Sequence, residues 1–94
     1  MTREEIIKQI EKCILSDRQN TYGTPENNFQ TIANLWNEYL GVKDDFFELS
    51  PKDVAIMMLL LKVARMKSSP NHIDNFVDCA GYSIIAGSFV DDKR

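Results

Sequence analysis

Two aspartates near the end of the chain have the spacing of a paired carboxylate site. Asp74 and Asp78 are four positions apart, so on a helix their side chains project from the same face. Such a pair can hold one magnesium ion through its oxygens. It can equally pair with cations on a neighbouring helix. The ion pair is the favoured interpretation, and the magnesium site is the alternative.

Two cations interrupt the most apolar segment of the sequence. Between Val54 and Met66 the only polar residues are Lys62 and Arg65, which are three positions apart and share a helical face. A charge in such a segment needs a carboxylate, a bound anion or a route to solvent along its own stem. The two cations therefore predict either contacts with the paired aspartates or a pocket for a phosphate group.

A third group of candidate residues lies in the expected connection between the first and second helices. Arg18, Tyr22, Gly23 and Thr24 combine a guanidinium, an aromatic ring and a glycine turn that leads into a helix N-terminus. These features suit an anionic ligand with a flat base. The alternative is a tight interhelical turn in which Tyr22 packs on the core.

Amide side chains follow on one face of the second helix. They are Asn27, Asn28, Gln30, Asn34 and Asn37. Such a face serves solubility or hydrogen-bonds a ligand, and Asn28 is the amide that we assign to the candidate pocket. The single histidine, His72, stands at a helix start without a Ser or Cys partner nearby, which favours a solvated or capping role over catalysis.

Cap residues mark where the helices that position these groups should begin. Each of the three prolines directly follows a Ser or Thr, a pairing typical of an N-cap and the first helical residue. The pairs are Thr24-Pro25, Ser50-Pro51 and Ser69-Pro70. A first helix over about residues 3–17 opens with a capping box of Thr2 and Glu5, and Gly41 should end the second helix.

Apolar residues recur at the helical period in all four segments, and no strand alternation, repeat or linker interrupts them. The sequence therefore predicts one all-α domain over residues 1–94, a four-helix bundle-like fold. A chain of 94 residues has a thin core, and the segment 53–66 is apolar nearly all round, so it needs cover on every side. We expect homo-oligomerisation to complete the bundle, and Phe46 and Phe47 to tuck the loop at 42–49 under the core.

Composition limits the classes of function. The apolar fraction is 44% and the net charge is −3, which argues against disorder and gives no support for DNA binding. The N-terminus is acidic rather than basic and then apolar, so it does not resemble a signal peptide, and the apolar segment is too short to span a bilayer. Cys13 and Cys79 lack zinc spacing and suit reduced, buried thiols. A cytoplasmic protein without a membrane partner is expected.

An ordered set of short motifs resembles a family of small phage and prophage proteins of uncharacterised function. The motifs are Arg18-x3-Tyr22-Gly23, Asn28-Phe29, Leu35-Trp36, Asp53-Val54-Ala55, Lys62-x-Ala64-Arg65 and Asp74-Asn75-x2-Asp78-x-Ala80-Gly81-Tyr82. They cover nearly the whole chain. The resemblance implies a phage origin and leaves the activity open.

A more distant resemblance is to the all-helical nucleotide pyrophosphohydrolases of the MazG and dimeric dUTPase type. That likeness implies an oligomeric helical enzyme that cleaves nucleoside triphosphates to monophosphate and pyrophosphate with magnesium. Asp74 and Asp78 match the family's Glu-x3-Asp metal motif with Asp in place of Glu. The companion Glu-x2-Glu motif is missing, because the preceding helix offers Asp53 and then Lys62 and Arg65.

Three functions follow as hypotheses. The preferred one is a nucleotide-binding protein that sequesters a signalling or cyclic nucleotide of bacterial defence, in a pocket lined by Arg18, Tyr22, Asn28, Lys62 and Arg65. The second is a pyrophosphohydrolase with magnesium on Asp74 and Asp78. The third is an oligomeric protein-interaction module without a small ligand, in which the two aspartates neutralise the two cations.

Overall fold

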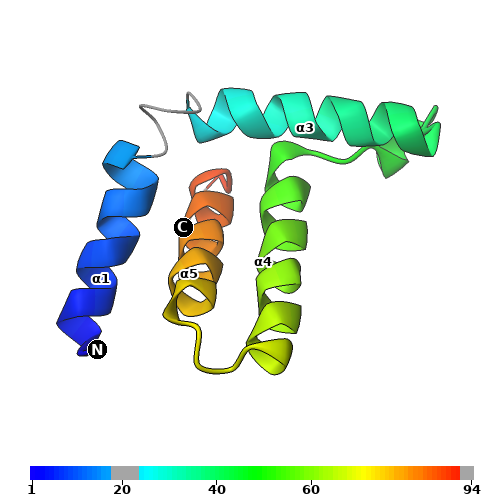
Figure 1. The fold of residues 1–94 in the computed structure, drawn as a ribbon. Helices are drawn as coiled ribbons and strands as arrows, with labels where there is room; N and C mark the ends of the chain where they lie inside the picture. The colour runs from blue at the N-terminus through cyan, green and yellow to red at the C-terminus, as the bar shows by residue number, and fades with distance from the viewer. Residues whose placement is uncertain (18–23, 92–94) are drawn as a thin grey trace.

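Four α-helices make up most of the described chain. The computed structural model describes residues 1–17 and 24–91, and no strand occurs within these ranges. The elements are, in chain order, α1 (Arg3–Glu11), the π-helical segment η1 (Lys12–Asp17), α3 (Pro25–Leu40), the short 3-10 turn η2 (Asp45–Phe47), α4 (Pro51–Ser68) and α5 (Ile73–Ser88). The prediction of an all-α fold is confirmed (Figure 1).

Local capping explains where α3 and α4 begin, as the sequence predicts. The hydroxyl of Thr24 accepts the Asn27 N–H at 3.3 Å. The hydroxyl of Ser50 accepts the Asp53 N–H at 3.2 Å, while the Asp53 carboxylate accepts the Ser50 N–H at 2.9 Å. These bonds satisfy backbone donors that a helix start leaves unpaired. Gly41, with a φ of 68°, ends α3 in the left-handed conformation that favours glycine.

The expected start of the last helix at Pro70 is wrong. Helix α5 begins at Ile73, with His72 in the N-cap position. Ser69 instead ends α4, because its N–H donates to the carbonyl oxygen of Arg65 at 2.8 Å. Pro70 lies in the reverse turn, since the chain must change direction before α5 can run back along α4.

The first helix opens as expected and changes character before its end. Thr2 and Glu5 form the predicted reciprocal capping box. The α-helical part stops at Glu11, and the following residues continue as the π-helical η1. The single α-helix expected over residues 3–17 is therefore correct in extent but not in helix type throughout.

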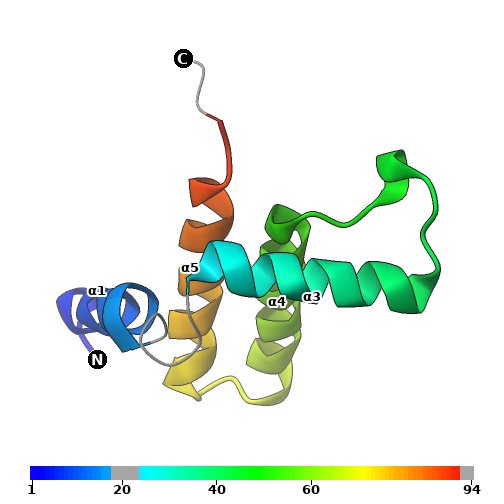
Figure 2. The ribbon, with the colours of Figure 1, turned by 90° about the horizontal axis from the view of Figure 1, so that it is seen from above.

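Helices α4 and α5 form an antiparallel hairpin to which the other helices attach. They lie side by side in both ribbon views, and α3 crosses one end of the hairpin (Figures 1 and 2). Helix α1 packs against α5 on the side away from α4 (Figure 1). The arrangement is elongated, with principal extents of 46 × 32 × 31 Å.

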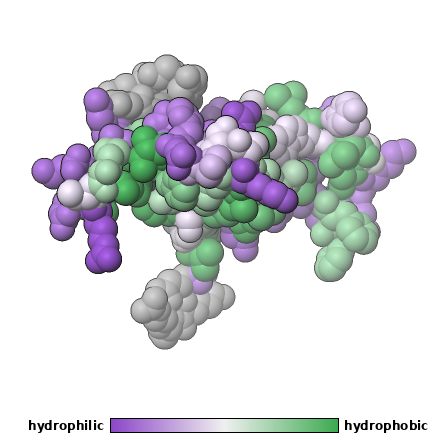
Figure 3. Space-filling model, turned by 60° about the horizontal axis from the view of Figure 1, so that its bottom comes forward, coloured by the Kyte–Doolittle hydropathy of each residue, from purple (hydrophilic) through white to green (hydrophobic). Residues whose placement is uncertain are grey.

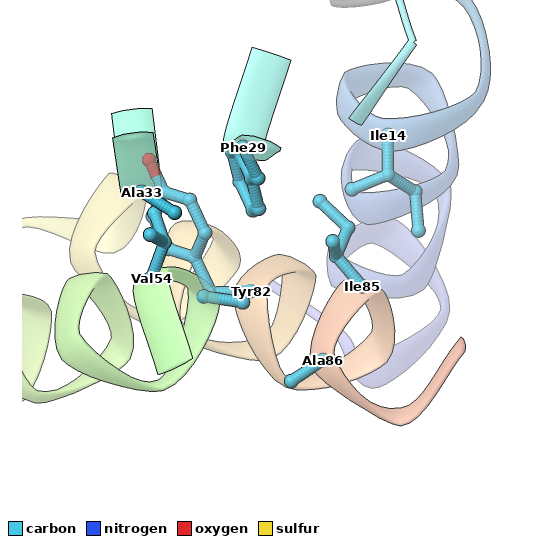
Figure 4. Close-up of a cluster of buried hydrophobic side chains, with 8 residues drawn as sticks. Ile14, Phe29, Ala33, Val54, Tyr82, Ile85 and Ala86 are labelled. Atoms are coloured by element: carbon cyan, nitrogen blue, oxygen red, sulfur yellow. The ribbon is translucent and has the colours of Figure 1, made fainter. Parts of the chain in front are cut away.

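The core forms where α3 meets the hairpin. The ring of Phe29 lies with its centroid 6.2 Å from that of Tyr82 and 6.4 Å from that of Phe89. Around this aromatic group the described chain buries Ile14, Ala33, Val54, Ala55, Ile85 and Ala86 (Figure 4). Burying a side chain such as Phe29 contributes roughly 1.5–3 kcal/mol, so this junction is what holds α3 to the hairpin.

A buried asparagine fixes the segment between α3 and α4. The Asn37 amide nitrogen donates to the Leu49 carbonyl at 3.0 Å, and its oxygen accepts the Leu49 N–H at 2.8 Å. The expectation that Phe46 and Phe47 lie under the core is wrong, because they are 86% and 67% exposed. Their rings contact each other edge to face, with centroids 5.2 Å apart. None of the described helices is both long and apolar enough to cross a bilayer.

Candidate anion-binding site

The structure pairs one of the two predicted cations with one of the two predicted carboxylates. Lys62 Nζ lies 3.0 Å from Asp78 Oδ2, and the two side chains are 17% and 22% exposed. The contact joins the middle of α4 to the middle of α5. Each charge is thereby compensated where water is largely excluded, which is the arrangement that a charge in an apolar segment requires.

The second predicted cation, Arg65, does not pair with the second predicted carboxylate, Asp74. Arg65 is exposed and forms no ion pair with any residue in the described ranges. Because the hairpin is antiparallel, three positions forward on α4 correspond to three positions back on α5. Arg65 therefore comes level with Asn75 rather than Asp74, and the Asn75 amide donates to the Arg65 carbonyl at 3.3 Å.

Arg65 borders an open hollow at the turn between α4 and α5. The hollow has a volume of about 540 Å³ and is lined by Arg65, Ser68, Ser69, His72 and Asn75. This size lies within the range of small-molecule sites. The Arg65 guanidinium and the Ser69 hydroxyl supply hydrogen-bond donors suited to a phosphate. The hollow can therefore accept an anion.

Backbone contacts hold this turn in place. The carbonyl oxygen of Arg65 accepts hydrogen bonds from the Ser69 N–H at 2.8 Å, from the Ser68 hydroxyl at 3.3 Å and from the Asn75 amide. His72 sits at the N-cap of α5 in an extended conformation and makes no side-chain cap hydrogen bond. The start of α5 thus has no side-chain cap, while the Asn75 N–H donates to the His72 carbonyl oxygen at 3.1 Å.

The described residues do not assemble a metal site from the predicted aspartates. Asp74 is 67% exposed, with its Oδ2 3.7 Å from His72 Nε2, while Asp78 is engaged by Lys62. No group of three or more His, Cys, Asp or Glu side chains with metal-binding spacing occurs within residues 1–17 and 24–91. Only two carboxylates, on one helix face, are available to a cation here.

Of the five predicted ligand-binding residues, the three that the structure describes, Asn28, Lys62 and Arg65, do not come together within one chain. Arg18 and Tyr22 lie outside the described residues. Asn28 is half-buried on α3, next to Phe29, which packs in the same cluster as Val54 at the start of α4. Arg65 lies eleven residues beyond Val54, which is about 16 Å along a helix. Lys62 faces α5, so of the three described residues only Arg65 lines the hollow.

Sequence reasoning missed most of the residues that surround Arg65. Ser68, Ser69 and Asn75 line the hollow, yet the sequence marks the serines only as a turn and a helix cap. Their position directly after a helix end that carries Arg65 and Lys67 was the available signal. A guanidinium and a serine hydroxyl are both able to donate hydrogen bonds to an anion.

Comparison with known proteins assigns the chain to a family. The family model described as a domain of unknown function, DUF6378, matches residues 5–90, which is nearly the whole sequence. The chain belongs to the DUF6378 family. Both helices of the hairpin and the complete hollow lie inside the matched range, so they are part of what the DUF6378 domain comprises.

DUF6378 relatives occur in phages. The chain is 40% identical over 80 residues to the Gene 55 protein of Mycobacterium phage D29, covering 85% of this chain and 50% of that protein. It is 42% identical over 79 residues to the Gene 55 protein of Mycobacterium phage L5, covering 83% and 47%. The chain thus spans about half the length of these relatives. The resemblance to phage proteins of uncharacterised function is confirmed.

No solved structure matches this DUF6378 chain. The distant resemblance to the MazG-type pyrophosphohydrolases is not shown by the family match or by the phage relatives.

Proposed function

We propose that this DUF6378 protein binds a phosphate-bearing ligand of the nucleotide class in the hollow at the α4–α5 turn. The observation that carries the proposal is the state of Arg65. It is a guanidinium without an ion-pair partner in the described ranges, and it borders a hollow lined by Ser68, Ser69 and His72. A planar guanidinium can hold two phosphate oxygens at once.

The surroundings of Arg65 support an anionic ligand over a neutral one. The Ser69 hydroxyl adds a donor, and the start of α5, where His72 makes no side-chain cap hydrogen bond, adds the positive end of a helix dipole. Asp74 adds the opposite charge near His72 at 3.7 Å. This carboxylate opposes anion binding, and solvent screens its charge and that of Arg65 alike, because both side chains are exposed.

Binding without cleavage is the role that these contacts favour. The carboxylate of Asp78 is held by Lys62 at 3.0 Å, so magnesium would have to displace a cation to reach it. Sequestration of a signalling or cyclic nucleotide is accordingly the function that we propose for the bound state. The pyrophosphohydrolase alternative stays a prediction, and its signature would be pyrophosphate release that Asp78→Ala abolishes.

Calorimetry tests the proposal with two probes, ATP and a cyclic dinucleotide. Wild-type protein should bind at least one of them, and Arg65→Ala should weaken that binding by about 10- to 100-fold, as expected for a charge-assisted hydrogen bond of about 1.5–3 kcal/mol. Lys67→Ala is the matched control, since it removes the same charge two residues further along α4 at a position outside the hollow. Absence of heat with both probes, or equal losses in the two variants, would contradict the proposal.

A further inference from the structure

The side of the α4–α5 hairpin that faces away from α3 is apolar and uncovered by other described residues. Val54 and Ile85 are buried in the cluster that includes Phe29 of α3. Val63 lies nine residues after Val54 on α4, and Phe76 lies nine residues before Ile85 on α5. Nine residues make about two and a half helical turns, so Val63 and Phe76 project from the faces opposite to Val54 and Ile85. Val63 is 46% exposed and Phe76 is 42% exposed.

The register of the hairpin shows that this side is continuous. The contacts of Lys62 with Asp78 and of Arg65 with Asn75 bring position 60 level with position 80 and position 56 level with position 84. The open hairpin face is defined here as Ile56, Leu60, Val63, Phe76, Ala80 and Ile84. Its five large side chains are between 40% and 58% exposed. Viewed with the underside turned forward, the middle of the molecule shows apolar patches with hydrophilic side chains between them (Figure 3).

The open hairpin face has no charge within it. From Val54 to Ala64 the one charged residue of α4 is Lys62, and it turns toward Asp78 in the interior of the hairpin. Interface cores are depleted in charged side chains, and contiguous exposed apolar patches mark interaction sites. The charged residues on the same stripe of α4, Lys52 and Lys67, lie beyond its two ends, four positions before Ile56 and four positions after Val63.

The chain exposes more surface than expected for a compact folded monomer of its mass. It exposes 7049 Å², whereas a compact monomer of this mass is expected to expose about 5,500 Å². The excess of about 1,500 Å² is a sum over the whole chain, and it exceeds the roughly 800 Å² that each partner contributes to an interface of standard size. The radius of gyration of 14.6 Å is likewise above the value of about 12 Å for a compact chain of this length.

We propose that a second copy of this chain covers the open hairpin face, so that two α4–α5 hairpins form a four-helix bundle around a two-fold axis. Both helices contribute exposed large side chains to the face, among them Leu60 at 58% on α4 and Ile84 at 52% on α5. A two-fold axis lets the α4 side of the face in each copy pack against the α5 side in the other. This inference does not depend on nucleotide binding at Arg65.

Sedimentation equilibrium of the 94-residue protein tests the proposal, with circular dichroism to monitor folding. Wild-type protein should have twice the chain mass of 10.8 kDa. Leu60→Glu and Ile84→Glu, one on each helix of the face, should reduce the mass to that of one chain. Leu35→Glu is the matched control, because Leu35 on α3 is similarly exposed, at 63%, but lies outside the open hairpin face.

Each outcome decides the proposal. A wild-type protein with the mass of a single chain overturns it and leaves the face to another partner. A dimer that survives both glutamates on the face, or that Leu35→Glu dissociates equally well, also overturns it. Loss of helical signal in Leu60→Glu but not in Leu35→Glu, together with a dimeric wild type, supports it, because a residue this exposed in one chain is essential to folding only when a second copy covers it.

Discussion

Lys62 Nζ and Asp78 Oδ2 lie 3.0 Å apart across the α4–α5 hairpin, and most of both side chains is covered. This contact and the hydrogen bond from Asn75 to the Arg65 carbonyl define the register of the two helices. It also separates the roles of the paired residues, because Lys62 and Asp78 stabilise the hairpin while Arg65 and Asp74 are exposed at its turn. The two cations thus differ in their roles, and so do the two aspartates: one of each stabilises the hairpin and the other lies exposed at the turn.

Asp78→Ala should destabilise the protein by about 2 kcal/mol. The estimate lies between the 0–1 kcal/mol of exposed ion pairs and the roughly 3–5 kcal/mol lost when one partner of a fully buried pair is removed. Urea unfolding measures the change. The matched control is Asp74→Ala, which removes the same side chain one turn earlier where it is 67% exposed, and it should change the free energy of unfolding by less than about 0.5 kcal/mol. Equal effects in the two variants would contradict the structural role of the pair.

The helix starts of α3 and α4 could be predicted from sequence because capping is local. Thr24 and Ser50 need only the N–H group three residues ahead to act as caps. Ser69-Pro70 has the same local pattern and failed, because the Ser69 N–H is taken by the Arg65 carbonyl at the end of the preceding helix. Competition between two helix ends depends on tertiary contacts that the local pattern does not contain.

The partners of the two cations could not be predicted for a related reason. Helical spacing shows that Lys62 and Arg65 share a face, and it shows the same for Asp74 and Asp78. It does not contain the register between the helices. A shift of a single position decides whether Arg65 meets Asp74 or Asn75. The hollow at the turn results from that register, and for this reason most of its lining residues could not be predicted from the sequence.

Asn37→Ala should cost about 2 kcal/mol. The Asn37 side chain makes two hydrogen bonds to Leu49 in a buried position, and its loss leaves the Leu49 backbone donor and acceptor unsatisfied, at about 1–3 kcal/mol. Asn34→Ala, on the exposed side of the same helix, removes only a contact with Gln30 and should be nearly neutral. Thermal unfolding compares the two. An Asn37 variant as stable as the Asn34 variant would show that the two hydrogen bonds between Asn37 and Leu49 do not stabilise the fold.

Substitution by alanine should change the stability differently at two glycines of α5. A Cβ at Gly87 meets no atom within 4 Å, so Gly87→Ala should raise the stability by about 0.5–1 kcal/mol through helix propensity. A Cβ at Gly81 would lie 3.1 Å from the Ile14 side chain, and Gly81→Ala should fail to give this gain. Gly81→Leu should lose about 1–3 kcal/mol as it forces η1 away from α5. Chemical denaturation of the three variants measures the differences, and a gain from Gly81→Ala equal to that from Gly87→Ala would mean that η1 packs less closely than the structure shows.

The start of α1 should respond to acid through one carboxylate. The Glu5 side chain accepts the Thr2 N–H at 3.2 Å, and this hydrogen bond, followed by the contact with the Thr2 side chain, lowers the pKa of Glu5 below its ordinary value of 4.5. A lowered folded pKa means that the contribution to stability is present above pH 4.5 and is lost as the pH falls through the lowered pKa. The Thr2 amide resonance in NMR spectra should follow this titration with a midpoint below 4.5. Glu5→Gln should abolish the titration, whereas Glu4→Gln should leave it in place; a midpoint at or above 4.5 would show that the capping box does not persist in solution.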